Sequence, residues 1–370
     1  MSLSRCTTTR FLRISATPRT SWTSCAGITR RSRCSCRRAI ARSSTRGRAV
    51  AGSATRRFLA SRGLPERDLG ELPESAKRFP DGAHYRVEIP STEGPRAFEA
   101  VLDEAERRSV PVVRISQGSG VFMHTDEELD GMARLGAVNG VEVSLFARPS
   151  AGWDSSAMAR APVGPLVAPT ARGTEQLVAV LEDARRAAAH GIRSVLIQDI
   201  GVLSVFAAMR RTGELPADMQ AKVSVMLPVA NPASARVIVE LGANTINLPT
   251  DLTLAQVGAI RAAVDVPLDV YVECPDNLGG FVRFHEIADL IRVAAPVYLK
   301  FGLRGTTDPY PAGLHMEPQL VALARERVRR ARLALDLLER EASGEFETSR
   351  AGAAGLALPA KALASVTPGG

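Results

Sequence analysis

Between residues 84 and 340 the sequence alternates eight times between a short run rich in β-branched residues and a longer amphipathic segment. The short runs predict strands, and the segments with apolar residues at helical spacing predict helices. Eight consecutive strand–helix units match a closed (β/α)₈ TIM barrel, whose typical size is ~250 residues. An open doubly wound sheet would carry a glycine fingerprint, which the sequence lacks. The predicted strands are 84-HYRVEIP, 111-PVVRISQ, 141-VEVSLFA, 193-RSVLIQD, 222-KVSVMLP, 244-NTINLP, 267-PLDVYVE and 296-PVYLKFG.

The starts of the predicted helices carry recognisable signals. Thr125 followed by Glu128 predicts a capping box, and Pro232 suits a first helical position. The predicted helices cover 95–108, 125–138, 174–190, 202–211, 232–242, 253–264, 281–294 and 317–340.

The basic character of the chain is concentrated at its start. Residues 1–63 contain fifteen Arg and no Asp, Glu or Lys, so residues 64–370 hold 47 − 15 = 32 basic residues against 39 acidic ones. We expect 1–63 to be a disordered leader or a spurious translation of GC-rich DNA. A mitochondrial transit peptide and a nucleic-acid-binding arm are the alternatives. Because the rest is mildly acidic, nucleic acid is an unlikely partner.

The remaining composition bears on compartment and on the C-terminus. No apolar run reaches the ~18–20 residues that span a bilayer, so no membrane contact is expected. Cys274 is the one cysteine after the leader, which favours a reducing, cytoplasmic setting. Residues 342–370, rich in Ala, Gly, Ser and Pro, predict a flexible tail. An oligomer is compatible with all of this.

Strand alternation predicts which side chains face the barrel interior. If the strongly apolar positions face the helices, the opposite set faces inward. That set is mostly polar, whereas most barrels fill this space with branched apolar residues. It comprises Arg86, Glu88, Arg114, Ser116, Glu142, Ser144, Gln198, Ser224, Asn247, Asp269, Tyr271, Glu273 and Lys300.

The last two strands and the first predict a catalytic cluster. Barrel closure puts the eighth strand between the seventh and the first, so Lys300 should lie between Glu273 and Glu88. Glu88 or Glu273 would act as general base or acid. The alternative is a structural ion network that sets register.

Further residues are candidates for substrate binding at the carboxyl ends of the strands. An anionic or peptidyl substrate would contact cationic and amide side chains there. The loop 117-QGSGVFMHT could cradle an anion, and the connection 148–173 could form a lid with Trp153 and Asp154. The predicted substrate-binding residues are Arg114, Gln198, Asn231, Asn247, Arg304 and His315.

Other chemistries have weaker support in the sequence. Glu88, Asp199, Glu273 and His315 could supply metal ligands, but no established ligand spacing joins them, so no metal or other cofactor is predicted. Cys274 next to acids would be a poor nucleophile. A Schiff base at Lys300 conflicts with flanking carboxylates that hold its ammonium protonated.

The run 241-LGANTINLPTDLTLAQVGAIRAAVDVPLDVYVE resembles the corresponding segment of the U32 peptidases, the collagenase-like family. The resemblance implies a barrel with a polar C-terminal rim and hydrolase activity. The family's cysteine-containing signature is replaced here by 273-ECPDNLGG. The iron–sulfur cluster of some relatives is not expected, because its cysteine ligands are missing. The alternatives to a hydrolase are a metal-assisted lyase or aldolase and a non-catalytic scaffold.

Overall fold

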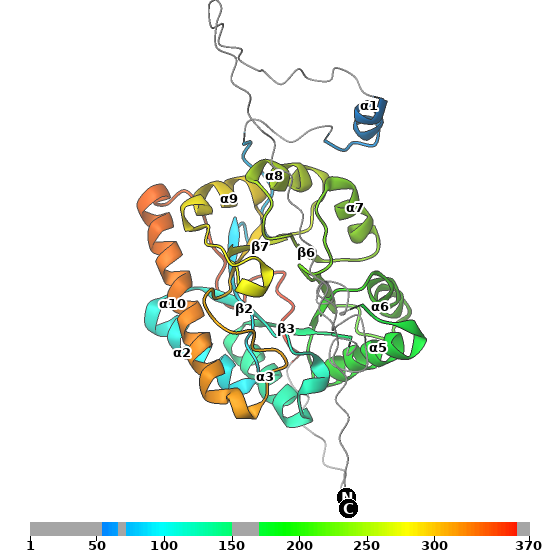
Figure 1. Cartoon of the computed structure of the whole chain (residues 1–370), viewed down its shortest axis with the longest axis vertical. Coiled ribbons are helices and arrows are strands. Elements are labelled where there is room, and N and C mark those ends of the chain that lie inside the picture. The colour runs from blue at the N-terminus through cyan, green and yellow to red at the C-terminus, as the bar shows by residue number, and fades with distance from the viewer. Residues whose placement is uncertain (1–53, 66–71, 150–169, 361–370) are drawn as a thin grey trace, which may run out of the picture. The chain divides into compact units, whose positions relative to one another are not determined.

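The structure is a computed structural model that describes residues 54–65, 72–149 and 170–360. Eight parallel strands pair in sequence order and close on themselves, which confirms the predicted (β/α)₈ barrel (Figure 1). Each strand pairs with the strands that precede and follow it in the sequence, and the last pairs with the first. The strands are β1 (Tyr85–Ile89), β2 (Val112–Ser116), β3 (Glu142–Phe146), β4 (Ser194–Ile197), β5 (Gln220–Val223), β6 (Thr245–Asn247), β7 (Leu268–Glu273) and β8 (Val297–Phe301).

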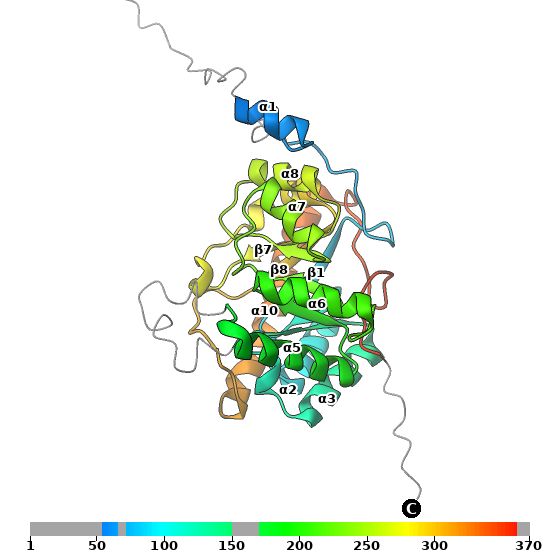
Figure 2. The same ribbon diagram turned by 90° about the vertical axis from the view of Figure 1, so that its right-hand side faces the viewer.

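Helices surround the strands as an outer ring, and Figure 2 shows α5 to α8 stacked along one side of the barrel. The capping box of Thr125 and Glu128 is present, and Pro232 opens its helix as expected. The helices of the ring are α2 (Pro95–Arg108), α3 (Asp126–Asn139), α5 (Gly173–Ala189), α6 (Ile200–Thr212), α7 (Pro232–Glu240), α8 (Leu254–Ala263), α9 (Ile287–Ala294) and α10 (Glu317–Ala342). Short 3₁₀ turns precede three of them at Val121–Met123, Phe284–Glu286 and Leu314–Met316, and another lies at Asp276–Leu278.

The hydrophobic core lies between the strands and the helical ring. Val87, Val143, Val270 and Leu299 alternate with the polar strand positions and are fully buried in this layer. Because successive strand residues point to opposite faces, the polar set is left for the barrel interior. The apolar layer therefore sets the register that brings charged side chains together inside.

The N-terminal end of the barrel interior is closed by two segments. Phe79 packs edge-on against Tyr298 with ring centroids 5.2 Å apart. From the other end of the chain, Ser349 Oγ accepts a hydrogen bond from Arg86 Nε at 2.8 Å, and the Ala354 carbonyl accepts one from Arg86 Nη2 at 2.6 Å. These two segments therefore cover the floor of the barrel interior.

These contacts correct the expectation of a flexible tail over 342–370. Residues 343–360 lie against the barrel, because buried polar groups inside it need partners that the tail's backbone supplies. The Ala357 amide donates to Glu142 Oε2 at 3.2 Å, in addition to the bonds of Arg86. Residues 361–370 lie outside the described ranges.

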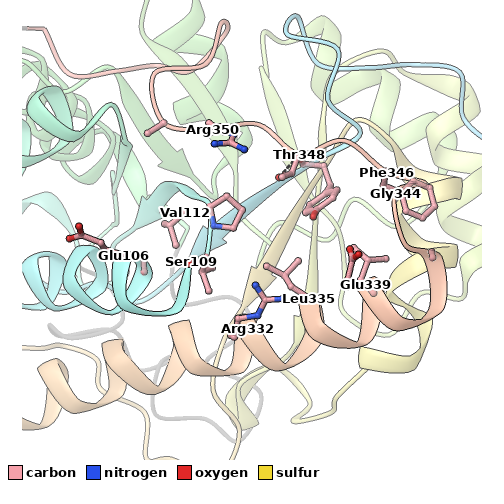
Figure 3. A pocket seen from close by; sticks show the side chains of 17 residues that line it. Glu106, Ser109, Val112, Arg332, Leu335, Glu339, Gly344, Phe346, Thr348 and Arg350 are labelled. Atoms are coloured by element: carbon pink, nitrogen blue, oxygen red, sulfur yellow. Dashed lines mark hydrogen bonds between the residues drawn. The ribbon is translucent and has the colours of Figure 1, made fainter.

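The same segment borders a groove of about 570 Å³ between α2 and α10 (Figure 3). Leu335 and Val112 contribute to its apolar wall, and Arg332 and Arg350 to its polar one. Val112 and Tyr85 begin their strands, so the groove lies at the N-terminal end of the barrel. Barrel enzymes place their chemistry at the other end.

The predicted disordered leader of 1–63 also needs correction at its end. Residues Ala54–Ser61 form helix α1, in keeping with the high helix propensity of its Ala, Arg and Leu residues. The carbonyl of Gly63 then accepts a hydrogen bond from Arg236 Nη2 at 2.7 Å. Residues 1–53 lie outside the described ranges, as do Trp153 and Asp154 of the predicted lid.

Among the helices of the described residues, none combines the length with the hydropathy that crossing a membrane requires.

Candidate functional site

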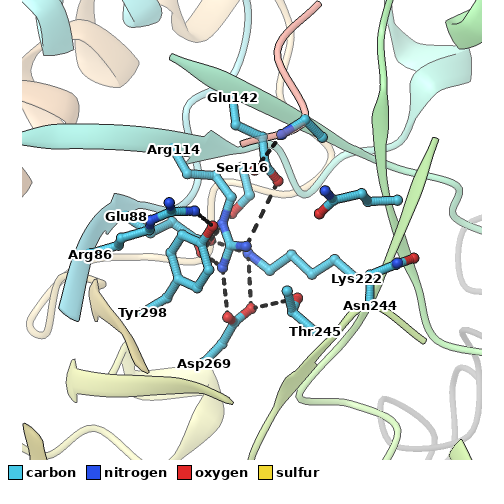
Figure 4. Close-up of polar contacts among 12 residues, drawn as sticks. Arg86, Glu88, Arg114, Ser116, Glu142, Lys222, Asn244, Thr245, Asp269 and Tyr298 are labelled. Carbon is cyan, nitrogen blue, oxygen red and sulfur yellow. Dashed lines mark hydrogen bonds and ion pairs between the residues drawn. The ribbon is translucent and has the colours of Figure 1, made fainter. Parts of the chain in front are cut away.

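Polar and charged side chains fill the barrel interior (Figure 4). The strand positions that alternation assigned to this interior are all buried, although Glu273 turns out to face elsewhere. Two layers can be distinguished. A lower layer of ion pairs is surrounded by strands on every side, and a polar upper layer lies nearer the carboxyl ends of the strands.

Glu88 of β1 is the centre of the lower layer. Its Oε2 accepts a hydrogen bond from Arg114 Nε at 2.7 Å, and its Oε1 accepts one from Ser116 Oγ at 2.6 Å. Lys222 Nζ of β5 contacts the same Oε1, and Lys300 Nζ of β8 lies 3.4 Å from it. One carboxylate therefore joins three cations from three strands.

Arg114 of β2 is paired with further acids. Besides Glu88, its Nη2 lies 2.7 Å from Asp269 Oδ1, and its Nη1 lies 3.7 Å from Glu142 Oε1. Its guanidinium stacks on the Tyr298 ring at 3.3 Å from the centroid. Because three carboxylates of the protein already face its guanidinium, the expectation that Arg114 binds substrate is not supported. It belongs to the structural layer instead.

The lower layer is balanced in charge when its members are ionised. Three acids face three bases, and such balance is what a buried ionic cluster needs to offset the cost of desolvation. The acids are Glu88, Glu142 and Asp269, and the bases are Arg114, Lys222 and Lys300.

The pKa values within this layer bear on the predicted roles. Burial favours the protonated form of Glu88, but Arg114, Lys222 and Lys300 outweigh it and hold the pKa of Glu88 well below its usual range. An anion this strongly stabilised is a weak base. The predicted general-base role therefore does not suit Glu88, whose carboxylate orients the cations. Burial, reinforced by the charges of Arg114 and Lys300, lowers the pKa of Lys222 to about 7 against the attraction of Glu88 and Asp269.

Glu273 does not lie beside Lys300, so that part of the predicted catalytic cluster is wrong. The register between β7 and β8 shifts between Tyr271 and Glu273, and Tyr271 is paired with Lys300 while Glu273 is paired with Phe301. This irregularity re-aims the side chain, as bulges at barrel rims commonly do. Glu273 Oε1 instead accepts bonds of 3.0 Å each from Arg330 Nη1 of α10 and from the Arg304 amide. Burial raises the pKa of its carboxyl group.

The upper layer contains Asn247 and Tyr271, and Lys300 of the lower layer reaches up to both of them. The ammonium of Lys300 lies 4.5 Å from the centroid of the Tyr271 ring. With its amide in the hydrogen-bonding orientation, Asn247 accepts a bond from Lys300 Nζ at 2.8 Å and donates one to the Asp269 carbonyl at 3.2 Å. Asn247 and Lys300, predicted from different strands, are thus brought together.

Gln198 and Ser144 in this region have polar atoms without partners. Gln198, at the carboxyl end of β4, is only 2% exposed. Within the described residues neither its Oε1 nor its Nε2 has a hydrogen-bond partner, and the same holds for Ser144 Oγ. An unsatisfied buried polar group costs about 1–3 kcal/mol. Gln198 therefore has a donor and an acceptor available for a ligand, and unpartnered polar atoms also occur deeper in the interior, on Arg114, Asp269 and Ser194.

The predicted anion cradle after β2 is already filled by a side chain of the protein. Glu93, buried in the loop after β1, accepts bonds from the Gly118 amide at 2.7 Å and from the Ser119 amide at 3.2 Å. The Tyr310 ring lies so close to Gly118 that a Cβ there would come within 2.5 Å of it. This part of the rim is tightly packed and does not offer free amides.

Three predicted substrate-binding residues lie away from the upper layer or have other roles. Asn231 is an exposed N-cap of α7, with its side chain accepting from the Ser234 amide. Arg304 is 58% exposed and lies 3.5 Å from Asp276. His315 is exposed in the turn before α10. Nothing in the described residues joins these side chains to Lys300.

Sequence reasoning missed two residues of the interior that bear charge. Lys222 lies two residues before Ser224, so alternation along a strand puts both side chains on the same face. Because Ser224 was assigned to the interior, the same reasoning could have identified Lys222. Arg327 lies on α10, and strand parity has no bearing on a helical residue. It is buried at the mouth of the barrel, where its Nη1 donates to the Ser91 carbonyl at 3.1 Å.

Neither a metal cluster nor a reactive thiol emerges from the described residues. No three of their His, Cys, Asp and Glu side chains gather closely enough to hold a metal ion. Cys274 is buried, and its Sγ donates to the Leu278 carbonyl at 3.0 Å. Burial raises the pKa of this thiol, so it is poorly suited to nucleophilic attack.

Fold and interior together define a (β/α)₈ barrel with an ionic interior and a polar mouth. Residues 167–274 match the model of peptidase family U32. This stretch contains the whole of 241–273, on which the resemblance was based, so the resemblance to the U32 peptidases is confirmed over this part of the chain.

Several solved structures are similar to the chain. A U32 peptidase is 18% identical, with 66% of this chain and 88% of that chain covered and a TM-score of 0.35. A truncated 3-deoxy-D-arabino-heptulosonate 7-phosphate synthase from Thermotoga maritima is 13% identical over 75% of this chain and 95% of that chain, with a TM-score of 0.40. A thiamine phosphate pyrophosphorylase from Pyrococcus furiosus is 11% identical over 69% of this chain and 98% of that chain, with a TM-score of 0.38. No curated protein matches the sequence.

Proposed function

We propose that the protein is a hydrolase that cleaves an amide bond in a small anionic or peptidyl substrate bound at the mouth of the barrel. The observation that carries this proposal is the Gln198 side chain, which is buried at the carboxyl end of β4 with both polar atoms unpartnered among the described residues. A primary amide offers one donor group and one acceptor, and a peptide group in a substrate offers the complementary pair.

Lys300 is the residue best placed to act on the substrate carbonyl. Its ammonium contacts Asn247 on the side of the polar mouth and Glu88 on the side of the ionic layer. A fixed cation in a site with little water stabilises the negative charge that develops on a carbonyl oxygen under attack. Lys300 would therefore serve as the electrophilic group, and Asn247 would orient it.

Proton transfer is assigned to the pair of lysines that share Glu88. Lys222 and Lys300 both face Oε1 of this carboxylate, and the pKa of Lys222 near 7 suits transfer at neutral pH. In the reaction the oxygen of a water molecule bonds to the carbonyl carbon. Its proton passes to the departing nitrogen as the C–N bond breaks, so no other reactant is consumed.

The relation to the U32 peptidases supports the hydrolytic assignment, and the altered signature limits which residues perform it. Cys274 in 273-ECPDNLGG is buried with a raised thiol pKa. The chemistry is therefore assigned to the barrel interior and not to a cysteine. A lyase or aldolase with an anionic substrate is the competing activity.

The test measures amine release from a panel of N-acetyl amino acids and acidic dipeptides with fluorescamine. Lys300→Met should lower kcat/KM by about 10²-fold or more, because it removes the electrophilic cation. Gln198→Leu should act mainly on KM, by about tenfold. Gln319→Leu, an exposed glutamine on α10, is the matched control and should behave as the wild type.

The proposal fails if the wild type releases no amine from any member of the panel. It fails equally if folded Lys300→Met protein retains wild-type kcat/KM on a substrate that the wild type cleaves.

A further inference from the structure

Arg327 is a buried cation without an acidic partner. It lies on α10, is 3% exposed and reaches the end of β1, where Nη1 donates to the Ser91 carbonyl at 3.1 Å. Its Nε is buried without a hydrogen-bond partner in the described part of the chain. No carboxylate of the described residues lies within ion-pair distance of it.

Other buried cations of the protein are compensated in an identifiable way. Arg114, Lys222 and Lys300 share the acids of the lower layer, and Arg86 lies 3.6 Å from Asp81. Arg261 has no acid within ion-pair distance among the described residues either, but its guanidinium donates to the Val264 carbonyl just after α8. The C-terminal end of a helix carries partial negative charge that suits a cation. Arg327 has no such explanation, because its helix continues for fifteen further residues to Ala342.

The acids nearest Arg327 are already engaged. Burial lowers the pKa of Arg327, opposed by the charges of Tyr310, Glu93, Tyr271 and Glu273. Glu93 accepts bonds from the amides of Gly118 and Ser119, and Glu273 accepts bonds from Arg330 and the Arg304 amide. These bonds hold both carboxylates in place, and Glu273 Oε2 has no hydrogen-bond partner among the described residues and does not pair with Arg327.

Hydroxyl groups surround the same position. Tyr310 and Ser91 hydrogen-bond to each other through their hydroxyls. Ser91 has a φ of 56°, an uncommon conformation outside glycine, and such strain is frequent at binding sites. Tyr271, whose ring lies against Lys300, makes no hydrogen bond through its hydroxyl among the described residues. The Arg327 charge thus acts on a donor-rich region next to the upper layer.

We propose that Arg327 anchors a carboxylate or phosphate group of the ligand, with Nε and Nη2 as the two donors and Tyr271 as a neighbouring one. Nη1 is used by Ser91, which leaves this edge of the guanidinium free. An arginine fork of this kind pairs with two oxygens of a carboxylate or phosphate. The inference rests on the proposed function for the location of the remaining substrate, and it identifies the substrate's anionic group as the one that Arg327 recognises.

The anchor is tested by thermal unfolding and isothermal titration with two probes, inorganic phosphate and malonate. Wild type should bind at least one of them with a Kd below about 50 mM and gain thermal stability with concentration. Arg327→Met should weaken that Kd by about tenfold or more, since one charged bidentate contact is lost. The stronger of the two probes identifies phosphate or carboxylate as the preferred group.

Two further variants separate an anion anchor from a structural role. Arg329→Gln removes a 45% exposed arginine of the same helix and should leave the Kd unchanged. Arg327→Lys keeps the charge without the fork and should recover part of the binding. Without a probe, Arg327→Met should melt no lower than the wild type, because it replaces an uncompensated buried cation with an apolar side chain of similar length.

The anchor is overturned if Arg327→Met binds both probes as the wild type does, if the wild type binds neither, or if Arg329→Gln loses binding equally. A lower melting temperature of Arg327→Met with unchanged anion binding also overturns it, in favour of support for Ser91. If anion binding depends on Arg327 but no amide substrate is cleaved, the anchor stands and the hydrolase assignment fails.

Discussion

At the scale of single residues, Glu88 has the greatest influence on the interior. Its carboxylate receives Arg114, Ser116, Lys222 and Lys300 from three strands, without any exposure to solvent. These partners explain why it remains ionised while buried. They also explain why it holds other groups in place and is poorly suited to remove protons.

Replacing Glu88 by glutamine should be strongly destabilising. The change leaves Arg114, Lys222 and Lys300 with one negative charge fewer, and breaking a buried ion pair costs roughly 3–5 kcal/mol. Urea unfolding monitored by circular dichroism gives the free energy of unfolding. Glu99→Gln, which removes an exposed pair with Arg96, is the control and should change it by about 0–1 kcal/mol. A loss below about 1 kcal/mol for Glu88→Gln would contradict the ionic layer.

The alternation of side chains along each strand predicted much of the site, but it failed where the backbone departs from a regular strand. Glu88, Asn247 and Lys300 meet because the apolar pattern fixes the register of their strands. Glu273 was misplaced because a register shift near the end of β7 cannot be read from alternation. Arg327 comes from a helix, and its approach to the mouth depends on how α10 packs, which one sequence does not specify.

At the scale of elements, the strands and helices themselves were the most predictable part. Clear apolar periodicity and caps such as Thr125 and Pro232 determined them locally. The segment 343–360 was not predictable, because its composition is that of a flexible chain. Its order comes from long-range bonds to Arg86 and Glu142 inside the barrel.

Removing that segment should destabilise the barrel. A chain ending at Thr348 lacks two hydrogen-bond partners of Arg86, namely Ser349 Oγ and the Ala354 carbonyl, and exposes the floor of the interior. Two hydrogen bonds to a charged group contribute roughly 1.5–3 kcal/mol each, so the melting temperature should fall by about 5 °C or more. A chain ending at residue 360 retains these contacts and should melt as the full chain does. Equal melting of the two truncated chains would show that the segment does not support the barrel.

At the scale of the whole molecule, the buried ionic layer makes stability depend on pH. Lys222 faces Glu88 of β1, Arg114 of β2, Asp269 of β7 and Lys300 of β8. On folding, burial lowers its pKa from the ordinary value of a lysine, about 10.5, to about 7. Between these values the unfolded state binds more protons than the folded state, so stability rises with pH across this window.

Lys222→Met should remove this contribution. The wild type should gain several kcal/mol of unfolding free energy between about pH 7 and 10 relative to the variant, because the penalty for protonating a buried amine disappears there. Parallel urea unfolding of both proteins across this range gives the difference, and groups common to the two cancel. Identical pH slopes would mean that Lys222 keeps an ordinary pKa in the folded protein.

The proposed function requires above all that the mouth of the barrel is a ligand site. The most direct test is a crystal structure at about 1.5 Å of the protein with an acidic dipeptide. We predict density for a bound molecule with one polar group within hydrogen-bonding distance of the Gln198 amide and another near Lys300 Nζ. Gln198 paired with the protein's own groups and a mouth closed by side chains, with no ligand density, would contradict it.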